Sequence, residues 1–374
     1  MASGRAMSFK LRRPIRPGRL RASKTRDEMM DKARCAALVL AAMLLFSWRC
    51  SPAAPQENWL SQAYDLALRE VEKNQSPEGY WPTFTTRAPV FHEARLEVNT
   101  FLQPIMIALL QPLTDEAGLT QTLERARDYT RKQLDDTGLV RFSPSFDPLH
   151  KGPDLCRDMT PDADDTSLAW NVAGTADSGA LALALQKLRT YRTAEGLFRT
   201  WLADEKDFRC LAPGADPNPP DIGINFHVYL FLARYDPSSA RALCQALIAK
   251  AKDSSLWVYY AQAPLIPLLR LGDVRRAGCP TVISGELIHP VDDAQAMWVK
   301  AISLLEVDLS PGTKARDEAM SLLGTLAQSR FAAIEASPPL LYHNDLTSVH
   351  KRDYWSKDFG YALWLRIYAR VIGP

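Results

Sequence analysis

Three carboxylates lie within four positions of this 374-residue chain, in the segment 162–165, which reads DADD. Thr160 and Pro161 precede the segment and an apolar run follows it, which predicts a helix with Thr160 as N-cap and all three acids in its first turn. The positive end of the helix dipole favours carboxylates there. Three so close cannot all ionise freely, because like charges raise the pKa of at least one of them. The cluster therefore predicts a neutral carboxyl beside ionised neighbours, which is a strong local acid; a solvated N-cap is the alternative.

A second motif has glutamine, glycine and tryptophan in the spacing Q-x-x-x-G-x-W, at Gln75, Gly79 and Trp81. This spacing resembles the QW repeat of squalene–hopene cyclases, in which the glutamine amide caps the next helix and the tryptophan stacks on it. The segment 162–166, DADDT, resembles the D-x-D-D-T acid motif of class II terpene cyclases. From about Trp59 to its end, the chain is similar to the superfamily of terpene cyclases and protein prenyltransferases.

Class II terpene cyclases protonate a carbon–carbon double bond of a linear isoprenoid, and the resemblance implies the same chemistry here. Asp164, the middle acid, would be the proton donor, and Asp162 and Asp165 would polarise it and help to return the proton. His227 and Asn225 are candidate polar partners of the acids. An imidazolium can bond one carboxylate oxygen and so fix which oxygen carries the proton. The expected small-molecule partner is therefore an isoprenoid.

The carbocation formed by protonation needs stabilisation without nucleophiles, which aromatic faces supply by cation–π attraction. Tyr259 or Tyr260 and Trp298 are the preferred candidates. The full set of aromatic candidates is Trp170, Tyr259, Tyr260, Trp298, Tyr354, Trp355, Tyr361 and Trp364.

The sequence predicts no metal and no other cofactor. No D-D-x-x-D magnesium motif is present, so diphosphate ionisation is not expected. Asp154, Cys156 and His227 loosely resemble the zinc ligands of prenyltransferase β-subunits, but the surrounding sequence does not. The six cysteines include no C-x-x-C pair. Cys156 and Cys210 could form a disulfide in an oxidising compartment, although their spacing does not decide this.

Apolar residues recur at helical spacing along most of the chain, and strand-like alternation is scarce. The expected helices span 57–74, 96–112, 116–133, 163–191, 194–203, 223–235, 237–251, 255–271, 291–306, 313–329 and 355–371, with an uncertain one near 270–288. Apolar helices alternate with amphipathic ones, which predicts a buried inner set covered by an outer set. The expected fold is all-α, a single α/α toroid or α6–α6 barrel.

In such a barrel the inner helices run parallel, so their N-termini meet at one mouth. The polar and aromatic residues expected there are Asn99, the three aspartates, Asn225, His227, Tyr259, Tyr260, Asp292, Asp293, Gln295 and Asp358. Polar groups above an apolar funnel are typical of a ligand site. For any single residue among them, helix capping is the alternative interpretation.

The N-terminal part differs in character from the rest. Residues 1–34 carry eleven Lys or Arg and three acids, without the aromatic interleaving of a nucleic-acid site, so no nucleic-acid partner is expected. An apolar segment, 35–48, follows and is short for a membrane span. We expect it to be a signal or anchor segment that associates the protein with a membrane, or alternatively an export signal. A linker, 49–56, leads to the barrel at 57–374.

Larger class II cyclases place their cavity between two barrels, whereas this chain has room for one. A dimer or a second subunit could therefore complete the cavity. Two other functions stay open. Asp164 paired with Asp292 or Asp293 could serve a glycan-processing enzyme, or the barrel could bind a lipid or a protein without catalysis.

Overall fold

The part of the chain that the computed structural model describes comprises residues 56–87, 91, 93–114, 119–144, 158–174, 177–209, 211, 217–250, 252–290, 292–343 and 352–373. Within it, the chain from Glu57 onward forms one compact unit. The basic tail, the apolar segment and the linker up to residue 55 lie outside the described residues. None of the helices in the described ranges has the length and apolar character needed to cross a membrane.

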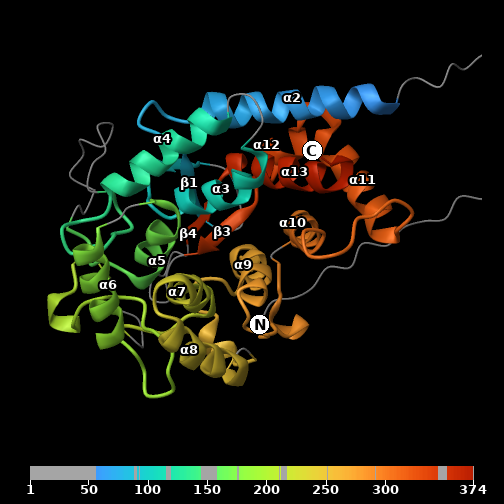
Figure 1. Ribbon diagram of the computed structural model, residues 1–374. Coiled ribbons are helices and arrows are strands. Elements are labelled where there is room, and N and C mark those ends of the chain that lie inside the picture. The colour runs from blue at the N-terminus through green and yellow to red at the C-terminus, as the bar shows by residue number, and fades with distance from the viewer. Residues whose placement is uncertain are drawn as a thin grey trace, which may run out of the picture. The chain divides into compact units, whose positions relative to one another are not determined.

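An inner ring of helices forms the centre of the described chain (Figure 1). Its members are α3 (Leu102–Leu110), α5 (Ala163–Val172), α7 (Ile222–Tyr235), α9 (Leu265–Arg276), α10 (Asp293–Ser303) and α13 (Lys357–Ile372). Each packs against the next, and α13 packs against α3 and closes the ring. Most residues of α3, α5, α7 and α13 are buried, as expected for helices that are apolar on all sides. This is the inner ring of an α/α toroid.

The outer helices are amphipathic and cover this ring. They are α2 (Gln56–Asn74), α4 (Leu119–Lys132), α6 (Ser178–Thr190), α8 (Pro237–Lys250) and α11 (Lys314–Ala327). In α4, Leu119, Leu123 and Ala126 recur at helical spacing and are fully buried, and the helix packs against α3 and α5. Short helical turns connect the main elements: η1 (Gln111–Leu113), η2 (Glu205–Asp207), η3 (Ser254–Leu256), η4 (Gly285–Leu287), η5 (Gln328–Arg330) and α12 (Ala332–Ala336).

A small antiparallel sheet corrects the all-α expectation. Its strands β1 (Thr83–Arg87), β2 (Arg95–Glu97), β3 (Leu340–His343) and β4 (Arg352–Trp355) have the order β2-β1-β4-β3. β1 pairs with β4, with Phe84 opposite Trp355, so the sheet joins the beginning and the end of the barrel. The strands are too short to show alternation in the sequence. β2 occupies the start of the expected helix 96–112, which begins only at Leu102.

Three further helix predictions are wrong in position. Residues 194–203 form turns and isolated bridges instead of a helix. The span 163–191 contains two helices, because Asp177 caps a new helix by accepting hydrogen bonds from the first N–H groups of α6. The expected helix 255–271 begins at Leu265, because the side chain of Asp221 holds the preceding backbone in a loop. Near 270–288, beyond the end of α9, the only helical turn in the described residues is η4.

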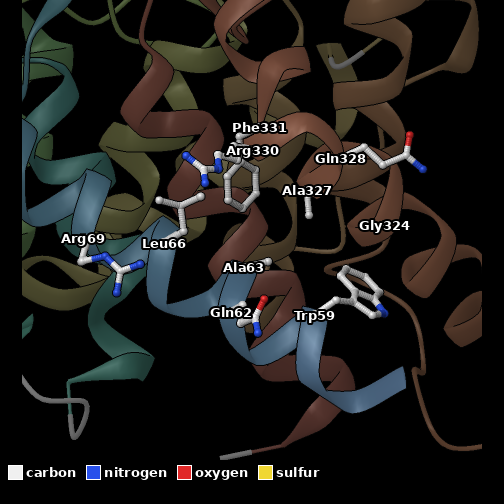
Figure 2. A pocket seen from close by; sticks show the side chains of 10 residues that line it. All are labelled: Trp59, Gln62, Ala63, Leu66, Arg69, Gly324, Ala327, Gln328, Arg330 and Phe331. Atoms are coloured by element: carbon white, nitrogen blue, oxygen red, sulfur yellow. The ribbon is translucent and has the colours of Figure 1, made fainter. Parts of the chain in front are cut away.

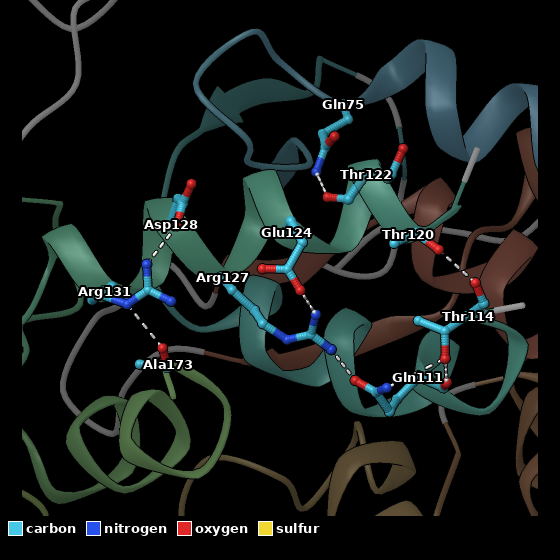
Figure 3. A network of polar contacts seen from close by, with 10 residues as sticks. All are labelled: Gln75, Gln111, Thr114, Thr120, Thr122, Glu124, Arg127, Asp128, Arg131 and Ala173. Carbon is cyan, nitrogen blue, oxygen red and sulfur yellow. Dashed lines mark hydrogen bonds and ion pairs between the residues drawn. The ribbon is translucent and has the colours of Figure 1, made fainter. Parts of the chain in front are cut away.

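The glutamine, glycine and tryptophan of the QW-like motif tie α2 to α4. The Gln75 amide donates to the backbone oxygens of Thr122 (2.8 Å) and Gly79 (3.0 Å); Figure 3 shows the first contact. Gly79 has a φ of +106°, and a Cβ there would lie 2.2 Å from the backbone oxygen of Arg125, so only glycine fits. The buried indole of Trp81 donates to the backbone of α2. The motif thus fixes the corner between two outer helices.

A disulfide links Cys244 of α8 to Cys279, which follows α9. It connects residues 35 positions apart and fastens an outer helix to the chain behind an inner one. The pair considered from the sequence, Cys156 and Cys210, lies outside the described residues.

Candidate active site

The helix that carries the acid cluster begins two residues later than the sequence indicated, with Asp162 and not Thr160 as its N-cap. The N-cap of α5 is Asp162, whose side chain accepts a hydrogen bond from the backbone N–H of Asp165 at 2.6 Å. Thr160 instead accepts a hydrogen bond from the backbone N–H of Arg209. Asp162 therefore caps the helix, while Asp164 and Asp165 lie in its first turn.

Asp164 contacts the side chains of His227 and Tyr260. The Nδ1 atom of His227, in the second turn of α7, contacts Asp164 Oδ1. The hydroxyl of Tyr260, in the loop before α9, donates to Asp164 Oδ2 at 3.3 Å. All three side chains are buried; Asp164, with 8% of its surface exposed, is the most accessible of them. Two elements distant in sequence thus converge on one carboxyl.

The pKa values of the other two acids are raised above the ordinary range. Burial, and then the charge of Asp164, raise the pKa of Asp162 from 3.8 to about 7. Burial, followed by the charges of Asp162 and Asp164, raises the pKa of Asp165 well above its ordinary value. Perturbed carboxyls of this kind gather at functional sites.

A cavity of about 80 Å³ lies against the acid cluster. Its described lining comprises the three aspartates, Phe101, Phe142, Thr200, Trp201, Ile224, Tyr259, Tyr260 and Tyr342. Most of this wall is aromatic, and its acids come from a single helix N-terminus. Ligand pockets commonly measure 300–1,000 Å³, so a ligand of isoprenoid size must displace part of the wall. Phe142, Trp201 and Tyr259 are only half-buried, which makes them the side chains best able to move.

Sequence reasoning missed much of this aromatic wall. Tyr342 on β3 stacks on Tyr354 of β4, with ring centroids 4.4 Å apart. Phe101 meets the edge of Tyr342 at 4.9 Å, and Phe142 approaches the same ring at 6.1 Å. Tyr342 lies on an unpredicted strand, while Phe101 and Phe142 lie in segments without a motif. The one sequence candidate close to this wall was Tyr354, which stacks on Tyr342.

Asp221 and Gly223 fix the loop that carries Tyr260. Asp221 Oδ1 accepts from the N–H of Gly223 at 2.7 Å, and Oδ2 accepts from those of Val258 (2.8 Å) and Tyr259 (3.0 Å). Burial raises the pKa of Asp221 to about 7 despite these hydrogen bonds. One carboxyl therefore caps α7 and holds the loop against it. Sequence reasoning assigned Asp221 no role.

Several predicted site residues lie elsewhere. Asn225 is buried, but its amide bonds the backbone of Phe198 and of Asp221. Asn99 lies nearer the cavity, because its amide approaches the Tyr342 hydroxyl at 3.4 Å. Asp292 caps α10, and both Asp292 and Asp293 are exposed and absent from the described cavity lining.

The predicted mouth therefore includes the N-terminal ends of α3, α5 and α7 and the loop before α9, but not the starts of α10 and α13. Gln295 donates to the backbone of Pro338, and Asp358 accepts from Asn74 of α2 at 2.9 Å. Neither residue is in the described lining of the cavity.

Among the predicted aromatic residues in the described lining, only Tyr259 and Tyr260 reach the cavity. The tryptophans among the candidates, and Tyr361, are packed into the core or against the sheet. The indoles of Trp170, Trp298 and Trp364 donate to the backbone of Gly138, Ser337 and Leu323, Tyr361 donates to Glu335, and Trp355 stacks on Phe84.

The structure does not test the zinc-like combination. Asp154 and Cys156 lie outside the described residues, and His227 contacts Asp164. Within the described ranges, no group of three or more His, Cys, Asp or Glu side chains could hold a metal ion.

Comparison with known proteins establishes the fold. No family model and no curated protein matches the sequence. A variant of type II terpene cyclase MstE from Scytonema, bound to its product merosterolic acid A, superposes with a TM-score of 0.54 at 15% identity, covering 85% of this chain and 99% of that one. A variant bound to its substrate, geranylgeranyl dihydroxybenzoate, gives 0.53 at 15% identity, covering 84% and 97%. The chain therefore has the α/α toroid fold of the type II terpene cyclases.

Proposed function

We propose that this protein is a class II terpene cyclase-like enzyme in which Asp164 protonates a carbon–carbon double bond of a linear isoprenoid. The supporting observation is the contact of one carboxyl with His227 and Tyr260 beside an aromatic cavity. Such an acid needs its conjugate base stabilised. Two hydrogen-bond donors on the carboxylate supply that stabilisation.

The reaction breaks the O–H bond of Asp164 and forms a C–H bond with the π electrons of the alkene, which leaves a carbocation. Phe101, Phe142 and Tyr342 line the same cavity, and aromatic rings suit this cation. Ring closure by further double bonds and loss of a proton then give an isomer of the substrate. Asp162 and Asp165, with their raised pKa values, hold protons that can return to Asp164.

The neighbours of the fold support a proposal for the substrate class. The MstE complexes contain geranylgeranyl dihydroxybenzoate and merosterolic acid A, so we propose a linear polyprenyl chain, free or joined to an aromatic group. The match covers 97–99% of those chains. A single barrel therefore matches nearly the whole of each, and the proposal needs no dimer or second subunit.

The test is incubation of the purified protein in D₂O with geranylgeranyl dihydroxybenzoate, geranylgeraniol and squalene. Protonation by an exchangeable carboxyl predicts a cyclic isomer that carries one deuterium on carbon, seen by mass spectrometry and NMR. Asp164→Asn should abolish it, because the amide keeps the shape but delivers no proton to carbon. An Asp164→Asn variant with full activity would exclude Asp164 as proton donor. A folded protein that binds these compounds without turnover would favour the non-catalytic binding barrel.

The glycan-processing alternative has less support. Glycosidases need two carboxyls about 5 to 9.5 Å apart on either side of the substrate. The proposed partners of Asp164, Asp292 and Asp293, are exposed and lie outside the described cavity lining.

For location, we propose that the apolar segment 35–48 attaches the barrel to a membrane or directs its export, with the barrel in an oxidising compartment. The Cys244–Cys279 disulfide supports this, because disulfides persist in such compartments. Deletion of residues 1–50 should release a folded barrel into the soluble fraction. A deletion variant that fails to fold would make the segment part of the core.

A further inference from the structure

A second pocket, of about 460 Å³, lies at the end of the ring opposite the acid cavity. Its walls come from the C-terminal parts of α3, α5 and α7 and from the second half of α9. The acid cavity, by contrast, is built at the N-terminal ends of α3, α5 and α7. The two sites are therefore separate, and the second is within the volume range of small-molecule pockets.

The described lining of this pocket combines apolar walls with an excess of positive charge. Arg127, Arg234 and Arg270 face a single acid, Asp273, while the walls include residues such as Ile107 and Leu168. Although burial opposes it, the charges of Arg270 and Arg276 hold the pKa of Asp273 below its ordinary value. Asp273 therefore stays ionised and pairs with Arg270, and Glu124, which is not part of the described lining, pairs with Arg127, so two of the three guanidinium charges are offset.

Arg270 is the most unusual member of the group. Only 6% of its surface is exposed, and its Nη1 donates to Asp273 Oδ2 at 2.8 Å. Its buried Nε–H has no hydrogen-bond partner among the described residues. A buried donor without a partner is costly, and guanidinium groups suit carboxylates, sulfonates and phosphates.

Structural roles account for part of this arginine set. Arg234 donates to the backbone oxygen of Asn171 at the end of α5, as basic residues at helix C-termini commonly do. Arg127 contacts Glu124 and Gln111, as Figure 3 shows. Neither role satisfies the Nε–H of Arg270. We propose that this pocket binds a small amphipathic organic anion, whose acidic group pairs with Arg270 and Arg234 and whose apolar body lies between α3 and α5.

The probe is laurate, compared with dodecanol, which has the same chain length without the charge. Isothermal titration calorimetry below the micellar concentration should give saturable binding of laurate at least tenfold tighter than of dodecanol. Raising NaCl from 50 to 500 mM should weaken the binding of laurate and leave the binding of dodecanol unchanged. Arg270→Met and Arg234→Gln should each lower the affinity for laurate at least fivefold and leave the affinity for dodecanol unchanged. Arg234→Gln keeps the experiment decisive if Arg270→Met fails to fold, because Arg234 is exposed.

A larger groove of about 780 Å³ supplies the matched control. It lies between α2 and the end of α11, with Arg69 and Arg330 among its described lining residues (Figure 2). Arg69→Gln should leave laurate binding unchanged, and so should Asp164→Asn at the acid cavity. Equal affinities for laurate and dodecanol, absence of saturable binding, or a loss confined to Arg69→Gln or Asp164→Asn would each overturn the proposal. Because the readout is binding, this result is independent of cyclase activity.

Discussion

Gly223, in the first turn of α7, lies directly against the ring of Tyr260. A Cβ on Gly223 would stand 2.4 Å from Tyr260 Cε2, closer than two carbon atoms can pack. The absence of a side chain at Gly223 therefore determines where the Tyr260 hydroxyl lies, and that hydroxyl donates to Asp164.

The first prediction tests this contact through Gly223→Ala. The added methyl should push the Tyr260 ring away and lower turnover of an isoprenoid substrate at least tenfold. Tyr260→Phe, which removes only the hydroxyl, should lower turnover by a similar factor. In a double-mutant cycle measured as kcat, Gly223→Ala should then add little on the Tyr260→Phe background. Fully additive effects would show that Gly223 acts through something other than this hydroxyl.

The second prediction concerns the imidazole on Asp164 Oδ1. His227→Leu removes the hydrogen-bond donor and should lower kcat by about 10²-fold or more, the usual cost of one donor on a developing anion. His227→Gln, whose amide can still donate, should recover part of that loss. Near-UV circular dichroism should show native packing in both variants. Equal activity of His227→Leu and the unmodified protein would contradict a role for this contact.

The third prediction follows from buried carboxyls outside the cavity. Burial raises the pKa of Asp358 from 3.8 to about 7. Its contribution to stability is therefore complete below about pH 4 and is lost as the pH rises through 7. A shift of this size corresponds to on the order of 4 kcal/mol. Asp358→Asn cannot ionise and can still accept from Asn74, so urea unfolding should show a smaller loss of stability between pH 4 and 7.5. If the free energy of unfolding of Asp358→Asn fell with pH as steeply as that of the unmodified protein, the raised pKa of Asp358 would be contradicted.

The fourth prediction concerns the disulfide. Cys244→Ser should lower the free energy of unfolding by about 2 to 4 kcal/mol, because the crosslink restricts the unfolded chain. Dithiothreitol should lower the melting temperature of the unmodified protein and leave that of Cys244→Ser unchanged. If the barrel resides in an oxidising compartment, Cys244 and Cys279 should resist alkylation in intact cells. Rapid alkylation of both would place the barrel in a reducing compartment.

The sequence predicted the helical ring and the acid cluster because both depend on local patterns. Hydrophobic periodicity identifies buried helices wherever they lie in the chain. The acidic character of the DADD segment is likewise visible in four consecutive residues and needs no information from the rest of the chain. The approach of His227 to Asp164 was also expected, since both belong to N-terminal turns of inner helices.

Features that depend on contacts distant in sequence were missed. The strand that carries Tyr342 is recognisable only through its pairing with β4. Tyr260 was expected in a helix, but the backbone N–H groups of the two preceding residues donate to Asp221 and keep that stretch in a loop, from which the Tyr260 hydroxyl donates to Asp164. Asn225 was expected to face the acids, but its side-chain amide instead bonds the backbone of Asp221 in its own helix and of Phe198, 27 residues earlier in the chain.

The pairing of β1 with β4 and the packing of α3 on α13 bring the two ends of the barrel together. A chain that emerges from the ribosome or a translocation channel N-terminus first can complete the strand pairing only after β4 is released, and the helix packing only after α13 is released. The contact between Phe101 and Tyr342, which belongs to the wall of the acid cavity, can form only after β3 has been synthesised. Contacts so far apart form late, because the intervening loop has to close first. The contacts of Asp164 with His227 and Tyr260 can form earlier, but the aromatic wall of the acid cavity is completed only near the end of folding, and a chain truncated before β3 lacks that wall.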